Sequence, residues 1–274
     1  MTLPITVCIP VKNEEENLPS SLDALGDFFA RIIVIDSGSS DRTRKIAEDR
    51  GIECFDFSWD GQFPKKRNWA LRHAGITTPW VFFLDADERV TSAFFQELEA
   101  VLPSTMHAGF WIAFDNWFMG QPLRHGDTFR KLSLFRVGSG EYERFPEDYW
   151  SHLDMEVHEH PVIEGSIGEI QHRLEHRDYR GMKHYLAKHN EYSSWEANRF
   201  RWLMDAGEEE WNRLNRRQRF KYQNLAKWWL GPFYFLISYV LKRGFLDGRE
   251  GWTFARLKMR YFNEIYLKIR ELES

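Results

Sequence analysis

Cysteine is scarce in this sequence, where Cys8 and Cys54 are the only two among 274 residues. Both lie in apolar segments, so we expect reduced core residues and no disulfide framework of the kind that holds small secreted domains together. A signal peptide pattern is also missing, because a strand-like apolar run begins almost at the first residue. The cytoplasm is therefore the expected compartment.

Glycine-rich phosphate loops are missing as well. The sequence contains neither Gly-x-Gly-x-x-Gly nor a Walker loop, so a phosphate would have to be held by a metal ion and by basic side chains. His-Glu-x-x-His and closely spaced cysteine ligands do not occur either, which argues against a dedicated zinc site. We therefore do not expect a zinc site among the five histidines of the stretch 152–176, which are His152, His158, His160, His172 and His176.

Charge is distributed unevenly along the chain. The formal net charge is −4, but residues 208–274 carry +6 and the first 207 residues carry −10. This asymmetry predicts a negatively charged partner for the C-terminal part. With 43% hydrophobic and 28% charged residues, the composition is that of a globular protein long enough for one large domain, or one domain with an extension.

The first hundred residues alternate between strand and helix signals. We expect strands at residues 5–11, 31–35, 52–57 and 80–84, and helices at 13–25, 42–50, 64–74 and 92–102. The first helix is expected to begin at Asn13, as an N-cap with Glu16 completing a capping box. Strict alternation predicts an α/β fold with a parallel sheet covered on both faces, in which ligands bind beyond the carboxyl ends of the strands.

From residue 109 onward the pattern changes. Residues 110–118 and 129–137 indicate a hairpin-rich stretch, and residues 179–206 return to a helical pattern. We therefore expect a first region of about 178 residues, followed by a helical extension at 179–274.

The strongest chemical signal is the pair Asp85 and Asp87, which follows the apolar run 81–84. In an extended backbone, residues two positions apart point to the same side, so the two carboxylates would converge. A pair of hard oxygen ligands without a full cage suits Mg²⁺ or Mn²⁺ held against a diphosphate. The alternative is an acidic turn after a strand. For Glu88 we expect contact with metal-bound water or capping of the next helix.

Two further motifs lie at expected strand ends or helix starts. Asp36 could accept hydrogen bonds from a nucleoside ribose or base edge, or it could be a turn residue. Lys65, Lys66 and Arg67 begin a helix where an anion would also meet free backbone N–H groups, so at least one of them is expected at the diphosphate, while the others could be solvated.

Taken together, these motifs resemble those of family 2 glycosyltransferases with the GT-A fold. The resemblance covers residues 4–102 and is weaker through Val157-His158-Glu159, His176 and 244–248. Within the family it is greatest to the bacterial branch that adds glucose to the lipopolysaccharide inner core. The motifs that carry it are Pro10-Val11-Lys12-Asn13-Glu14, Asp36-Ser37-Gly38-Ser39-Ser40-Asp41-Arg42-Thr43, Lys66-Arg67-Asn68 and Leu84-Asp85-Ala86-Asp87-Glu88.

The resemblance implies an enzyme that uses a nucleotide-diphosphate sugar, usually a UDP-sugar, together with a divalent cation, and that inverts the anomeric carbon. It implies a Rossmann-like GT-A fold with a mixed, mainly parallel sheet and a helical C-terminal extension. The catalytic domain would span 1–178, with a nucleotide-sugar half at 1–102 and an acceptor half at 103–178. Asp87 would be the main metal ligand. From the residues themselves we also expect Asp85 as a ligand, and a single histidine, with His158 as the candidate, that completes the metal shell or binds the acceptor. The residues expected around the nucleotide sugar are Pro10, Val11, Asn13, Glu14, Asp36, Lys65, Lys66, Arg67, Asp85 and Ala86.

Inversion by direct displacement requires a carboxylate that deprotonates the acceptor hydroxyl. Many inverting relatives use an acid in the second half of the domain. Glu159 is our first choice for this base, and Asp127 and Glu156 are its rivals. A structural ion pair is the alternative role for Glu159.

The C-terminal extension combines cations with aromatic residues. Residues 212–243 contain eight Lys or Arg and no Asp or Glu, and they enclose the mostly apolar stretch 228–241. This stretch is shorter than the roughly 20 residues that span a bilayer, and Pro232 is expected to interrupt its helix. Tryptophan and tyrosine flanked by cations suit a headgroup boundary. A core helix with a solvated basic flank is the alternative, and no nucleic-acid-binding module accompanies the cations.

The sequence therefore predicts a glycosyltransferase that is peripheral on the inner face of the cell membrane. Its acceptor would be a lipid-linked glycan such as lipopolysaccharide core, or a polyprenyl phosphate. A metal-dependent nucleotidyltransferase is a second class with carboxylates at strand ends, and it would release pyrophosphate. A non-catalytic membrane adaptor is the third, against which the intact Asp85 and Asp87 argue.

Overall fold

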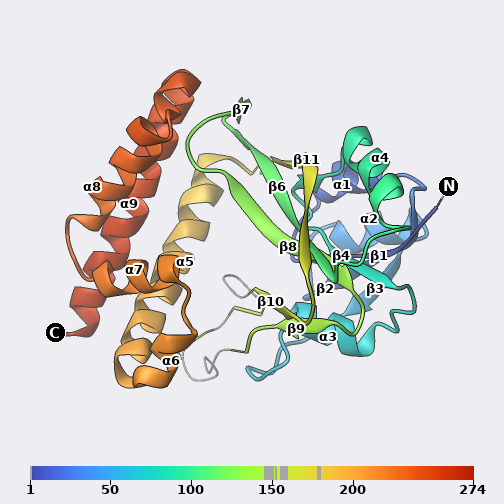
Figure 1. The fold of residues 1–274 in the computed structure, drawn as a ribbon, viewed down its shortest axis with the longest axis horizontal. Helices are drawn as coiled ribbons and strands as arrows, with labels where there is room; N and C mark the ends of the chain where they lie inside the picture. Colours follow the sequence, from blue (N-terminus) through green and yellow to red (C-terminus); the bar gives the residue numbers. More distant parts are fainter. Residues whose placement is uncertain (1, 145–150, 152, 155–159, 178–179) are drawn as a thin grey trace. The chain divides into compact units, whose positions relative to one another are not determined.

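The computed structural model describes residues 2–144, 151, 153–154, 160–177 and 180–274 (Figure 1). The chain forms two compact units. The first comprises Met1–Trp117 and Thr128–Tyr179, and the second comprises Phe118–Asp127 and Arg180–Ser274. The domain limits expected from the sequence stay a prediction.

The first unit is built on a mixed, mainly parallel sheet. Its strands follow the order β3-β2-β1-β4-β8-β6-β11-β5. The pairs β3–β2, β2–β1, β1–β4 and β6–β11 are parallel, whereas β8 runs antiparallel to both β4 and β6, and β5 runs antiparallel to β11. The strands are β1 (Leu3–Val11), β2 (Phe29–Asp36), β3 (Glu53–Asp56), β4 (Trp80–Phe83), β5 (Glu88–Arg89), β6 (Gly109–Phe118), β8 (Phe129–Arg136) and β11 (Ile167–Arg177). A separate antiparallel pair consists of β9 (Gly140–Tyr142) and β10 (Pro161–Ile163).

Apolar side chains cover both faces of the parallel strands. Ile5, Val7 and Ile9 of β1 belong to one core cluster, while Cys8 of the same strand belongs to the other. Burial on both faces is what the uninterrupted apolar runs indicate. The helices of this unit are α1 (Leu18–Leu25), α2 (Thr43–Glu48), α3 (Lys66–His73) and α4 (Ser92–Val101). The predicted α/β fold, a mixed and mainly parallel sheet with a helical C-terminal extension, is confirmed.

The predicted start of the first helix is wrong. Helix α1 begins at Leu18, and Asn13 has a left-handed backbone with φ of 56°. Asparagine tolerates this conformation better than most residues. The side-chain oxygen of Asn13 accepts a hydrogen bond from the Ser40 N–H at 2.8 Å. Asn13 therefore connects two loops and does not cap a helix.

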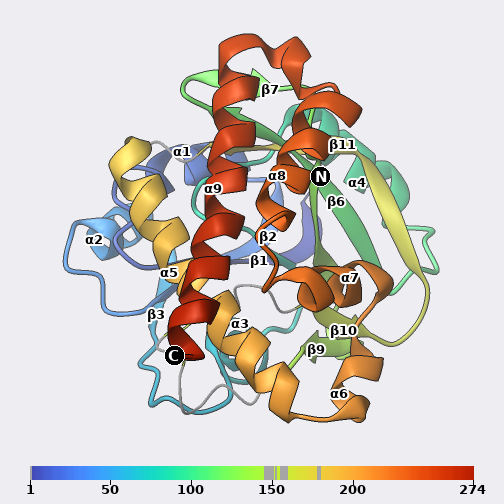
Figure 2. The ribbon, with the colours of Figure 1, turned by 90° about the vertical axis from the view of Figure 1, so that its left-hand side faces the viewer.

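The second unit is mainly helical. Its elements are β7 (Gln121–Leu123), α5 (Gly181–Asp205), α6 (Glu208–Arg213), α7 (Arg216–Asn224), α8 (Leu230–Leu236), the π-helical turn η1 (Ile237–Leu241), the 3₁₀ turn η2 (Gly244–Asp247) and α9 (Gly248–Leu272). Figure 2 shows α9 lying between α5 and α8. Phe200 and Leu203 of α5 and Ile265 of α9 share its apolar core.

Pro232 does not interrupt a helix, contrary to our expectation. It is the third residue of α8, and an N–H in the first turn of a helix has no intrahelical partner to lose. The stretch 228–241 thus contains one short helix followed by a π-helical turn. Within the described part of the chain, no helix combines the length and apolar character needed to cross a bilayer.

Candidate functional site

The loops that follow β1 and β2 are held together by side-chain hydrogen bonds. Besides the bond from Ser40 to Asn13, the Asn13 N–H donates to Ser39 Oγ at 2.9 Å, and the Glu14 N–H donates to Thr43 Oγ1 at 2.7 Å. The buried carboxylate of Asp36 accepts from Ser39 Oγ at 2.5 Å. These bonds fix one wall of the site, so Asp36 has a turn-stabilising role beside any contact with a nucleotide.

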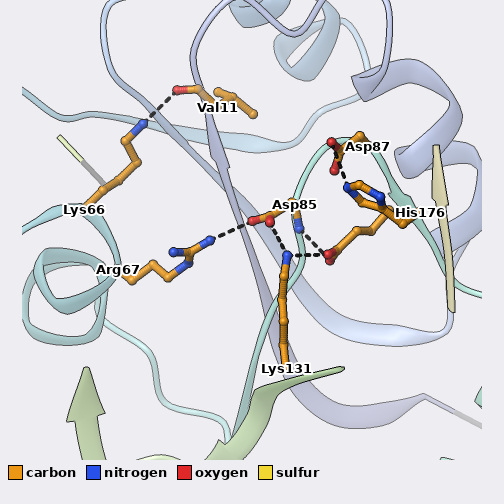
Figure 3. Close-up of polar contacts among 8 residues, drawn as sticks. Val11, Lys66, Arg67, Asp85, Asp87, Lys131 and His176 are labelled. Atoms are coloured by element: carbon orange, nitrogen blue, oxygen red, sulfur yellow. Dashed lines mark hydrogen bonds and ion pairs between the residues drawn. The ribbon is translucent and has the colours of Figure 1, made fainter. Parts of the chain in front are cut away.

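The basic start of α3 faces the interior of the first unit. Lys65, Lys66 and Arg67 are all buried, with exposed fractions of 5%, 1% and 7%, so the solvated alternative does not hold. Lys66 Nζ donates to the carbonyl of Val11, at the end of β1, at 3.2 Å (Figure 3). Burial lowers the pKa of Lys66, against the opposing effect of the Asp154 carboxylate at 3.5 Å.

Three acidic side chains converge just beyond β4. Oxygen atoms of Asp85, Asp87 and Glu88 all lie within 4.8 Å of one another. The convergence was predicted, but its reason is different: β4 ends at Phe83, and Asp85 and Asp87 lie in a turn closed by the Glu88 N–H donating to the Asp85 carbonyl at 3.0 Å. The turn, and not strand alternation, brings the carboxylates together.

Glu88 does not cap the following helix, because Thr91 caps α4 through a bond from the Phe94 N–H. Instead, the fully buried Glu88 carboxylate accepts from the Asp85 N–H at 3.0 Å. Glu88 therefore stabilises the turn that contains Asp85 and Asp87.

Two partners of this cluster were not assigned to the site from the sequence. Lys131 of β8 forms ion pairs with Asp85 and, at 2.5 Å, with Glu88. His176 of β11 places Nε2 at 3.3 Å from Asp87 Oδ2. Figure 3 shows Arg67 and Lys131 both pointing at Asp85, and His176 pointing at Asp87. No local signal singles out Lys131, because Arg130 and Arg136 are charged residues of the same strand.

Strand pairing explains how residues that are distant in the sequence come to lie beside the acidic cluster. β5 pairs with β11 so that Glu88 lies opposite His176, and the Arg177 N–H donates to the Asp87 carbonyl at 2.7 Å. Farther along β11, Glu97 of α4 accepts from the Gln171 and His172 N–H groups, each at 2.8 Å. This carboxylate stabilises the strand where its register with β6 shifts between Ile170 and Leu174.

The cluster has a polarised charge distribution. Burial acts to raise the pKa of Asp85, but Lys131 and Arg67 hold it well below its ordinary value. Burial raises the pKa of Glu88 to about 7, although Lys131 opposes this. Burial alone would lower the pKa of His176, yet the Asp87 carboxylate raises it above its ordinary value. Asp85 is therefore a firmly ionised carboxylate already engaged by cations.

A divalent cation fits the donors on the other side of the cluster. Asp87 offers carboxylate oxygens, which suit Mg²⁺ and Mn²⁺, and His176 offers an imidazole nitrogen, which suits a transition metal such as Mn²⁺ better than Mg²⁺. Three carboxylates face the permanent cations Lys131 and Arg67, which leaves one net negative charge when Glu88 is ionised and His176 is neutral. A metal ion at Asp87 would compete with the proton on His176, because metal ligands must be deprotonated.

Most of the remaining candidates, the possible bases and the possible histidine ligand, have no described position. Glu156, His158 and Glu159 lie outside the described residues. Asp127 belongs to the second unit, where it pairs with Lys258 and, at 2.5 Å, with Lys242. Burial acts to raise the pKa of Asp127, but Lys258 and Lys242 hold it below its ordinary value. A carboxylate stabilised in this way is a weak proton acceptor.

The sequence is similar to a family of transferases. The sequence model of the family described as Glycosyl transferase family 2 matches residues 6–157. A TPR repeat-containing protein of Synechococcus elongatus is 32% identical over 117 residues, which are 43% of this chain and 28% of that protein. The lipopolysaccharide core biosynthesis glycosyltransferase LpsC of Rhizobium meliloti is 29% identical over 204 residues, 71% of each chain.

Solved structures with partial similarity include glucosyl-3-phosphoglycerate synthase of Mycobacterium tuberculosis in complex with Mn²⁺, UDP and phosphoglyceric acid. It is 25% identical, with 42% of this chain and 43% of that chain covered and a TM-score of 0.32. TarS of S. aureus is 14% identical, with 99% and 92% covered and a TM-score of 0.45. Both TM-scores are low, so the assignment of the site residues rests on the geometry of this chain and not on these two structures.

Proposed function

Since this chain belongs to glycosyl transferase family 2, whose sequence model matches more than half of it, we propose that it transfers a sugar from a UDP-sugar to a lipid-linked glycan with inversion of the anomeric carbon. The observation that supports this most strongly is the cluster of Asp85, Asp87 and Glu88 beside the cations Arg67 and Lys131, at the carboxyl ends of the parallel strands. Ligands of α/β sheets bind at that edge.

The proposed donor site has two functions. Asp87 and His176, with Asp85 behind them, would hold Mg²⁺ or Mn²⁺, and the bound ion would offset charge on the departing diphosphate. Arg67 is already oriented by its 2.8 Å bond to Asp85, so it needs little reorganisation to meet a phosphate. The residues proposed to border the nucleotide sugar are Pro10, Val11, Asn13, Glu14, Asp36, Lys65, Lys66 and Ala86.

The proposed chemistry is a single displacement. The acceptor hydroxyl oxygen attacks the anomeric carbon, the bond from that carbon to the diphosphate oxygen breaks, and nucleoside diphosphate leaves. A carboxylate takes the hydroxyl proton. We assign this role to Glu159, with Glu156 as its rival, because Asp127 is engaged by two lysines.

The proposed acceptor is the sugar of a lipid-linked glycan, with lipopolysaccharide core as the first candidate because LpsC is similar over 71% of this chain. A polyprenyl phosphate is the second candidate. The net charge of +6 in residues 208–274 supports work at an anionic membrane surface, and we propose that the protein is peripheral on the inner face of the cell membrane.

The reaction products distinguish this proposal from nucleotidyl transfer. With Mn²⁺ and a panel of nucleotide sugars, we expect one UDP-sugar to give UDP in an amount equal to the glycosylated acceptor. Lipopolysaccharide core and polyprenyl phosphate serve as parallel acceptors, and product formation shows which one is used. Release of pyrophosphate from a nucleoside triphosphate, without UDP from any sugar donor, would disprove the proposed function.

Removing the base should separate binding from turnover. We expect Glu159→Gln to lower kcat about 10²-fold, while the dissociation constant for UDP and Mn²⁺, measured by calorimetry, stays within about twofold. Glu156→Gln and Asp127→Asn are the matched variants. If Glu159→Gln retains its rate and one of the matched variants loses it, the role belongs to that residue.

A further inference from the structure

The second unit carries an exposed apolar surface where α8 and α9 meet. We define the α8–α9 corner as residues 236–252, which include η1 and η2. Leu241 is 71% exposed, Leu246 is 53% exposed and Phe245 is 47% exposed. Large apolar side chains that gather on a surface in this way mark interaction sites more often than chance. The others exposed in the corner are Leu236, Val240 and Trp252.

The backbone of this corner is built tightly. A Cβ atom on Gly251 would lie 2.0 Å from the Gly244 carbonyl oxygen, and one on Gly244 would lie 2.7 Å from the Ser238 carbonyl oxygen. Only glycine allows these close approaches. The Asp247 carboxylate accepts from the N–H groups of Arg124 and His125, at 3.1 and 2.9 Å. The apolar side chains are therefore presented by a fixed scaffold.

A group of aromatic rings connects the two sides of the corner. The ring of Tyr239 lies 5.4 Å from Phe235, 6.2 Å from Phe245 and 5.1 Å from Trp252, measured between centroids. These contacts join α8, η1, η2 and the start of α9 into one continuous apolar surface. Packing inside the unit therefore accounts for the half-buried rings of Phe235 and Tyr239, but not for the exposure of Phe245, Leu241 and Leu246.

Cations surround the exposed side chains. Lys242, Arg243 and Arg249 are exposed, and so is Arg256 one turn beyond the corner. The acids of the corner are Asp247, which is occupied by the bonds described above, and Glu250. Apolar residues flanked by cations match the boundary between the headgroups and acyl chains of an anionic leaflet, where each basic residue adds to binding.

The segment that the sequence indicated for this role is less suitable. Trp229 packs against the apolar core of the second unit, and its ring lies 5.7 Å from that of Phe233. Trp228 is exposed, but Trp229 packs in the core and cannot enter a membrane surface together with it. The two tryptophans that begin the stretch 228–241 are thus divided between core and surface.

We propose that the α8–α9 corner docks on an anionic bilayer surface, with Leu241, Phe245 and Leu246 entering the boundary and Arg243 and Arg249 meeting lipid phosphates. This inference deepens the proposed function, since it rests on an acceptor that is held in a membrane. It names the surface through which the enzyme reaches that acceptor.

The test is co-sedimentation of the full chain with phosphatidylcholine vesicles that contain or lack phosphatidylglycerol. We expect the wild-type partition coefficient to be at least tenfold higher with phosphatidylglycerol, and Leu241→Glu/Leu246→Glu to lower it at least tenfold. Leu267→Glu is the matched control, because Leu267 is 62% exposed on α9 outside the corner. An environment-sensitive label on Leu246→Cys should shift to the blue with vesicles, and the same label on Leu267→Cys should not.

Four results would overturn the inference: no vesicle binding by the wild type, equal binding to both lipids, equal loss in the Leu267 control, or conversion of a dimer to a monomer by the corner variant. The last would make a second copy of this chain the partner. Vesicle binding is measured without donor, and UDP release is measured separately with each variant. Failure of docking is therefore distinguishable from failure of the proposed reaction.

Discussion

Replacing Asp87 by asparagine is expected to lower kcat/KM by about 10³-fold or more. Asparagine has the same shape but lacks the charge, and loss of a metal ligand removes several kcal/mol of stabilisation from the transition state. The affinity for UDP should become independent of Mn²⁺, because Asp87, which lies 3.3 Å from His176, is the proposed metal ligand. UDP release and calorimetry with and without Mn²⁺ measure the two effects.

The matched control for this variant is Asp115→Asn. Asp115 lies on β6 of the same unit and pairs with Arg173 at 3.1 Å, with nearly half of each side chain exposed. Exposed pairs contribute little to stability, so this variant should keep wild-type turnover and melting temperature. Unchanged turnover in Asp87→Asn, in a protein that melts like the wild type, would contradict the assignment of the metal site.

The parts of the site that are close in sequence could be predicted, because their positions follow from local patterns. The apolar run of β4 places Asp85 and Asp87 at a strand end, and the helical period of α3 places Lys66 and Arg67 at a helix start. Alternation of strands and helices then brings both ends to one edge of the sheet.

Lys131 and His176 could not be predicted in the same way. Lys131 reaches Asp85 because β8 inserts antiparallel between β4 and β6, with Phe82 opposite Leu134. A register shift of one residue would turn Lys131 to the other face. This register depends on the packing of strands that are about 50 positions apart in the sequence, and no local pattern contains it. The same holds for His176, which depends on the β5–β11 pairing.

The incorrect prediction at Asn13 has a related cause. Asparagine and serine side chains can bond to a helix terminus or to a neighbouring loop. The local sequence favours the bond to a helix terminus. The parallel pairing of β1 and β2 brings the two loops together, so that the bond to the neighbouring loop can form. The side-chain oxygen of Asn13 then accepts a hydrogen bond from the Ser40 N–H, and helix α1 begins five residues after Asn13. Loop-to-loop bonds of this kind appear only once the strands are placed.

The charge balance of the acidic cluster leads to the second large effect. We expect Lys131→Met to destabilise the first unit by about 3–5 kcal/mol, the usual cost of removing one partner of a buried ion pair. Methionine retains the apolar stem but leaves Glu88, which is fully buried, and Asp85 without their shared cation. Hydrogen exchange of the β1 and β4 amides, at neutral pH with a metal chelator, measures the free energy of unfolding for this unit.

Two further variants test whether the charge is the cause. Lys45→Met removes an exposed helix pair with Asp49, so it should cost no more than about 0.5 kcal/mol. Lys131→Met/Glu88→Gln should recover at least half of the stability lost in the single variant, because an uncharged amide no longer needs the cation. If the single variant is as stable as the Lys45 control, or if the second substitution recovers nothing, Lys131 does not neutralise these carboxylates. The balance of charge that leaves room for a divalent ion would then have to arise from other side chains.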